Sequence, residues 1–238
     1  MIKNDELLFP AGAEISVIPV LQGEGLPKID ESELPETIPI LALRNVVLFP
    51  GTIYPITIGR EKSKRLIADA EKHGTFIGAV PQLDVNVEEP GEEDLYRFGT
   101  VAKVIKTLDM PDGTVTAILQ SIKRIELLTV VDYDPYIKGI VRYLDDIITK
   151  ENSADLKGIA STIKDKASQI MANSNMAAKE AIGAMRSIDN FPFLVNFIAT
   201  TVDVENFEGK IDLLQYDDVK ARAMKLLVIL DGQLQLTN

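Results

Sequence analysis

Residues 38–145 carry short apolar or alternating runs separated by Gly, Pro and charged residues, a pattern typical of β-strands. Strands are expected at residues 38–44, 53–58, 76–80 and 136–144. One helix is expected at 60–74, because Leu66, Ile67 and Ala70 share a helical face and Gly74 follows as a stop signal. Strands without regular intervening helices favour an antiparallel or mixed sheet.

Two residue patterns refine this expected sheet. A hairpin is predicted over residues 98–127, because Asp112 and Gly113 lie between two alternating runs and tolerate the positive φ angles of a tight turn. Pro55 has no backbone N–H to donate to a neighbouring strand, so it favours a sheet edge for the strand at 53–58.

After residue 150 apolar residues recur every three or four positions, which predicts amphipathic helices. The two stripes consist of Leu156, Ile159, Ile163, Ala167 and Ile170, and of Val219, Ala223, Leu226, Leu227, Leu230 and Leu234. Shorter helical segments are expected between the stripes, with Asn175 and Asp203 as candidate N-caps. The predicted fold class is therefore α+β, with a β-rich subdomain at 38–148 and an α-helical bundle at 149–238.

Residues 1–37 form a zone of different composition. They hold eight acidic residues and two lysines, which is −6 of the total net charge of −11, and they are rich in Gly and Pro. This composition predicts a flexible acidic arm, and a solvated tail without a partner is favoured over a docking peptide.

Composition also narrows the classes of function. The 238 residues include no Cys and a single histidine, His73, which excludes disulfides, thiol nucleophiles and His-pair metal sites. The acidic balance argues against nucleic acid and anionic membranes as partners. No apolar run approaches the length of a membrane span and no signal-peptide pattern opens the chain, so a cytoplasmic location is expected.

A search for catalytic motifs yields no candidate. The chain has no G-x-x-x-x-G-K-[ST] phosphate loop and no G-x-S-x-G nucleophile turn. His73 is expected to interact with the C-terminal dipole of its helix, and neighbouring acids such as Glu88 and Glu89 are interpreted as solvated loop residues. No catalytic, cofactor-binding or metal-binding residue is therefore assigned.

An aromatic cluster, FPFLVNF at residues 191–197, allows two interpretations. Phe193 and Phe197 share a helical face, and Phe191 precedes them. A role in the core of the bundle is favoured over an exposed apolar patch that grips unfolded polypeptide.

Three blocks of sequence resemble the N-terminal domain of the Lon protease family. They are PILALRNVVLFPGTIYPITIGREKS at 39–63, the combination of EDLYRFGTVAKV at 93–104 with MPDGT at 110–114 and a later arginine, and LLQYDDVKARAMKLL at 213–227. The signature residues are Pro39, Leu43, Arg44, Phe49, Pro50, Gly51, Pro55, Gly59, Arg60, Gly99, Asp112, Gly113 and Arg124. Most are expected to be architectural, with Phe49 anchoring a fixed turn in the core. Gln120 and Ser121 depart from the Glu-Gly pair that is common in the family.

The resemblance implies a small β-rich pseudo-barrel with one helix, followed by stacked helices. It also implies the substrate-recognition and assembly domain of an ATP-dependent serine protease that captures unfolded or damaged proteins. No cofactor is expected in this fragment, whereas ATP, Mg and a Ser–Lys dyad belong to modules of the parent outside this chain. The parent is expected to be a homo-hexamer. Candidate substrate contacts are Met110 and Pro111 at the hairpin tip, and Phe191 and Phe193 near the bundle.

A free-standing Lon-type adaptor without ATPase or protease modules is the alternative. An amphipathic helix at 216–236 runs almost to the last residue, Asn238, which favours the fragment interpretation. A reading frame that continues into a G-x-x-x-x-G-K-[ST] motif would decide between the two. Neither a small hydrolase nor a DNA-binding protein is supported by a constellation of residues.

Overall fold

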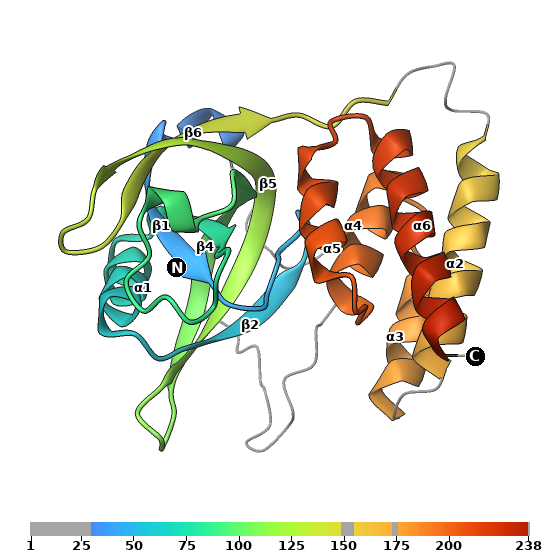
Figure 1. Ribbon diagram of the computed structural model, residues 1–238, viewed down its shortest axis with the longest axis horizontal. Helices are drawn as coiled ribbons and strands as arrows, with labels where there is room; N and C mark the ends of the chain where they lie inside the picture. Colours follow the sequence, from blue (N-terminus) through green and yellow to red (C-terminus); the bar gives the residue numbers. More distant parts are fainter. Residues whose placement is uncertain (1–29, 149–154, 173–175, 238) are drawn as a thin grey trace, which may run out of the picture.

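The computed structural model describes residues 30–148, 155–172 and 176–237. Figure 1 shows a sheet with one helix on one side and a group of helices on the other. The first half comprises β1 (Thr37–Leu43), β2 (Ile53–Ile58), α1 (Glu61–His73), β3 (Phe76–Pro81), β4 (Phe98–Asp109), β5 (Val115–Asp132) and β6 (Lys138–Leu144). The second comprises α2 (Leu156–Ala172), α3 (Met176–Arg186), α4 (Phe191–Thr201), α5 (Phe207–Asp212) and α6 (Val219–Thr237). The expected order, a β-rich part followed by helices, is confirmed.

Five of the strands close into a ring. The strand order is β2-β5-β4-β3-β1-β6, and β6 also pairs with β5. The β1–β3 pair is parallel and the other pairs are antiparallel, so the sheet is mixed. β2 pairs with β5 alone and lies at the end of the order, which confirms the edge position predicted from Pro55.

Local sequence signals explain where several elements end. Gly74 follows α1 in the left-handed conformation, with φ of 64°, and its N–H donates to the Ala70 carbonyl. The β4–β5 hairpin turns at Asp112 and Gly113, where Gly113 has φ of 83° and Asp112 Oδ1 accepts from the Thr114 N–H at 2.9 Å. Both features were predicted from the residues alone.

The helix N-caps differ from the predicted ones. Asn190 Oδ1 accepts from the Phe193 N–H at the start of α4, and Asn206 Oδ1 accepts from the Gly209 N–H at the start of α5, both at 2.9 Å. The prediction for Asp203 is wrong, because α5 begins four residues later, at Phe207. Asn175 lies outside the described residues.

The last part of the predicted acidic arm is bound to the sheet. Residues 1–29 lie outside the described residues, but Glu31 Oε2 pairs with Lys123 Nζ at 2.7 Å. The Tyr143 hydroxyl donates to the Pro35 carbonyl at 2.6 Å, and Thr37 already belongs to β1. The expectation of a flexible arm over all of residues 1–37 is therefore corrected for residues 30–37.

The turn between β1 and β2 joins the two halves. Phe49 is fully buried and belongs to the apolar core of the helical half rather than to the interior of the sheet. Gly51 has φ of 85°, and a Cβ there would lie 2.9 Å from Phe193 Cδ2. The Asn196 side-chain amide donates to the Pro50 carbonyl at 3.3 Å. The expected anchoring role of Phe49 is thus confirmed, and its partners are helices.

Arg124 of β5 is the second connection between the halves. Its side chain is 1% exposed and shares Asp146 with Arg222 of α6. Burial, followed by the charge of Arg222, lowers the pKa of Arg124. The Arg124 guanidinium donates to the Leu214 and Asp145 carbonyls at 2.8 and 2.9 Å, and to the carboxylates of Asp217 and Asp146 at 2.9 and 3.1 Å. One side chain therefore connects the sheet, the segment after β6 and the start of α6.

Candidate functional site

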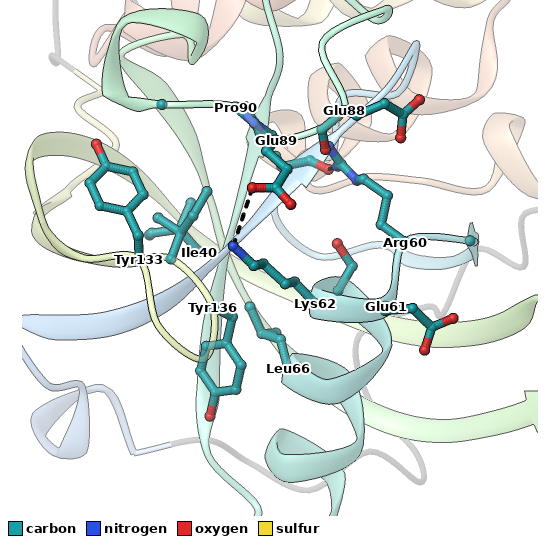
Figure 2. Close-up of a pocket in the computed structure, with 15 residues that line it drawn as sticks. Ile40, Arg60, Glu61, Lys62, Leu66, Glu88, Glu89, Pro90, Tyr133 and Tyr136 are labelled. Carbon is teal, nitrogen blue, oxygen red and sulfur yellow. Dashed lines mark hydrogen bonds and ion pairs between the residues drawn. The ribbon is translucent and has the colours of Figure 1, made fainter.

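A groove of about 600 Å³ opens where the N-terminal turn of α1 faces β1 and two loops (Figure 2). We call it the α1 groove. Its walls come from four segments that are far apart in sequence, at residues 40–42, 59–66, 88–91 and 133–137. Its size is in the range of natural ligand sites.

The floor of the α1 groove is apolar. Ile40 of β1 and Leu66 of α1 lie at its base and are 2% and 1% exposed. Tyr133 and Tyr136 flank them from one loop (Figure 2). The Tyr136 hydroxyl donates to Asp69 Oδ2 at 3.1 Å, which fixes the orientation of the ring, and burial together with this carboxylate raises the pKa of Tyr136. Such a floor accepts apolar or aromatic side chains.

Charged residues form the rim. Lys62 Nζ lies 3.5 Å from Glu89 Oε2, and Figure 2 shows this ion pair spanning from α1 to the opposite loop. The two side chains are 53% and 79% exposed, so the pair contributes little to stability, roughly 0–1 kcal/mol. A ligand could therefore displace it at low cost.

Arg60 holds the wall between β1 and the loop that precedes β4. Its Nη2 donates to the Ala42 carbonyl at 2.6 Å and its Nη1 to Gln82 Oε1 at 3.0 Å. Burial, and secondarily the nearby Arg44, lowers the pKa of Arg60. Arg44 reaches the same loop, donating to the Val87 carbonyl at 3.1 Å. These two signature arginines therefore position the groove wall.

The lining of the α1 groove combines an apolar floor with a charged rim. Among the described residues, no group of three His, Cys, Asp or Glu side chains could hold a metal ion. An apolar floor with a few polar groups at its edge is typical of ligand-binding sites. Within the same residues, no helix is both long and apolar enough to cross a membrane.

Comparison with known proteins decides the family. The family model described as the "ATP-dependent protease La (LON) substrate-binding domain" matches residues 37–232. The chain belongs to this family. It is 38% identical over 223 residues to a Lon protease of Flavobacterium johnsoniae and 40% identical over 211 residues to one of Porphyromonas gingivalis. These alignments cover 94% and 88% of the chain but only 27% and 25% of the relatives, so the chain spans about a quarter of their length.

Solved structures show the same fold. The N-terminal domain of a Mycobacterium avium complex Lon protease superposes with a TM-score of 0.65 at 16% identity, covering 82% of this chain and 98% of that one. A Lon N-terminal domain protein from Xanthomonas campestris gives a TM-score of 0.56 at 18% identity, covering 81% and 97%.

In this Lon substrate-binding domain, the four residues proposed from sequence as substrate contacts do not line the α1 groove. Met110 is 42% exposed and Pro111 is also exposed, both at the tip of the β4–β5 hairpin. Phe191 and Phe193 are 9% and 5% exposed and belong to the helical core. The assignment of these two phenylalanines as substrate contacts is therefore corrected, because their burial agrees with the other interpretation, a role in the bundle core.

Sequence analysis missed the floor of the α1 groove. Gly59 and Arg60 belong to the Lon signature, but Tyr133 and Tyr136 carry no motif and lie more than seventy residues from them along the chain. The sequence Tyr-Asp-Pro-Tyr, with two aromatic residues around a proline in a loop, is the one local signal that could have singled them out.

Proposed function

We propose that the chain is the substrate-recognition domain of an ATP-dependent serine protease and binds exposed apolar segments of unfolded or damaged proteins in the α1 groove. Membership of the Lon substrate-binding family supports a protein ligand. The single observation that carries the location is the apolar floor of Ile40, Leu66, Tyr133 and Tyr136 beneath a weak ion-pair rim.

The exposed hairpin tip is proposed as a second, weaker contact. Met110 presents a flexible apolar side chain to solvent beside Pro111. Weak contacts of this kind gain affinity when several copies act together. We therefore propose that the parent protein is a homo-hexamer, which would present several copies of this domain. We also propose that the parent is cytoplasmic and that separate modules of it bind ATP and Mg and carry the Ser–Lys dyad.

We further propose a division into a β-rich pseudo-barrel over residues 38–148 and an α-helical bundle over residues 149–238. The closed strand ring supports the first part. β6 ends at Leu144 and α2 begins at Leu156, which supports a boundary between these two elements.

Filling the α1 groove at Gly59 is expected to weaken substrate binding about tenfold, the equivalent of about 1.4 kcal/mol. A Cβ at Gly59 would meet no atom within 4 Å, so Gly59→Leu projects into the groove without a clash. The measurement is the fluorescence anisotropy of labelled, carboxymethylated α-lactalbumin, which stays unfolded.

Gly158→Leu is the matched control, because Gly158 is an exposed residue of α2 whose Cβ position is equally open. It should bind the unfolded protein like the wild type. Equal binding by the Gly59 and Gly158 variants would remove the α1 groove as the recognition site.

A further inference from the structure

Two strand edges in the sheet are not fully covered by a neighbouring strand, one on β1 and one on β2. β1 pairs with β3 across Ile40–Leu43, whereas β6 covers its other edge only across Thr37–Pro39. β2 has β5 on one edge and, within the described residues, no strand on the other. Two strand edges therefore lack a neighbouring strand over these residues. On the β1 edge, the Ile40 N–H donates to the Ile137 carbonyl and the Ala42 carbonyl accepts from Arg60.

These two edges line the same cavity. A groove of about 520 Å³, which we call the β2 groove, is lined by consecutive residues of both strands, 41–43 from β1 and 54–58 from β2, and by Arg44 directly after β1. It shares Ala42, Gly59, Arg60, Ser63 and Glu88 with the α1 groove, so the two grooves adjoin.

The register of β2 shows which backbone groups face the gap. The Ser121 N–H donates to the Thr52 carbonyl at 2.9 Å, and β2 then pairs with β5 from Ile53 to Ile58 without a register shift. Because hydrogen-bonding direction alternates along a strand, Tyr54, Ile56 and Ile58 bond toward β5 while the backbone of Pro55 and Thr57 points into the β2 groove. The side chains alternate between the two faces of the sheet with the same period, with Ile56 and Ile58 buried and Thr57 exposed.

The open edge is restricted but still usable. Pro55 offers only a carbonyl, which protects an exposed edge against pairing with other copies of the chain. Thr57 offers both N–H and C=O. The Pro55 carbonyl and the Thr57 N–H and C=O can therefore pair with the backbone of a short extended segment.

We propose that the β2 groove binds an extended substrate segment as an added strand along β2. The segment alternates apolar and polar residues, because Leu41, Leu43, Ile56 and Ile58 form an apolar floor beneath the gap while its upper side faces solvent. Backbone pairing supplies affinity without a fixed sequence, which suits a domain that recognises many unfolded proteins. This inference rests on the proposed function and names its substrate class.

The test compares Thr57→Pro with Thr57→Val in the full chain. The probe is a fluorescein-labelled peptide of alternating Val and Thr flanked by lysines. Proline removes the one N–H of this edge near the centre of the gap and leaves every bond to β5, so binding should weaken about tenfold. Valine keeps the N–H, so that variant should bind within about twofold of the wild type. Pro55→Val, which adds an N–H, should bind the peptide more tightly.

A second experiment leaves the protein unchanged, so it still tests the proposal if the Thr57→Pro variant does not fold. N-methylation of one alternate set of peptide amides should abolish binding, while methylation of the other set should not. Equal binding of both methylated peptides, or equal binding by the Thr57→Pro and Thr57→Val variants, overturns strand addition. The proposed function still stands in that case if the wild-type chain binds carboxymethylated α-lactalbumin. A wild-type chain that binds neither probe overturns both.

Discussion

Replacement of Arg124 by alanine is expected to lower the free energy of unfolding by about 3–5 kcal/mol. Arg124 is 1% exposed and supplies donors to Leu214, Asp145, Asp146 and Asp217. Its removal empties a fully buried site, leaves the buried Leu214 carbonyl without this donor, and leaves the partly buried Asp146 beside Arg222 alone. The cost is therefore that of breaking a buried charge network rather than of losing one surface ion pair.

Urea unfolding followed by circular dichroism measures this loss. Arg65→Ala is the control, because Arg65 lies on the exposed face of α1 and should change stability by less than about 0.5 kcal/mol. Arg124→Lys should recover little, since lysine cannot reproduce the fork of donors. A loss below about 1 kcal/mol for Arg124→Ala would contradict the assigned connection between the halves.

Phe49→Ala is expected to cost about 3–5 kcal/mol, the range for truncating a buried aromatic side chain. Phe49 is fully buried among helical core residues, although it lies in the turn between two strands. The cavity would open at the contact between the halves, so both should lose stability together in one transition. Thermal unfolding followed by near-ultraviolet and far-ultraviolet circular dichroism reports tertiary and secondary structure separately.

Phe76→Ala is the matched control for Phe49. Phe76 begins β3 and is only partly buried, so the same truncation should cost clearly less. Equal costs for the two variants, or a Phe49→Ala variant that unfolds in two separate steps, would argue against a shared core at this turn.

Local chemistry explains which parts of this fold could be predicted from sequence. Asp112-Gly113 determines a turn, Gly74 ends a helix and Pro55 favours an edge, because each acts through its own backbone. The α1 groove depends instead on segments from residue 40 to residue 137 that meet only after the ring closes. No periodicity or spacing in the sequence encodes that meeting.

Arg124 and Phe193 illustrate the same limit. Arg124 belongs to the signature, but its partners Leu214 and Asp217 lie 90 and 93 residues away, so only the folded chain shows that it joins the halves. Phe193 carries the same apolar side chain whether it packs or binds substrate. The folded structure shows that Phe193 lies in the core, where its ring packs so closely against Gly51 that a Cβ on Gly51 would clash.

Hydrogen–deuterium exchange with and without carboxymethylated α-lactalbumin tests most directly whether this domain holds unfolded polypeptide between β1, β2 and α1. The account predicts slower exchange at residues 53–66, 88–91 and 133–137, with a smaller effect at the hairpin tip, residues 109–114. Protection confined to helices α2 to α6, or no protection at saturating client, would contradict it.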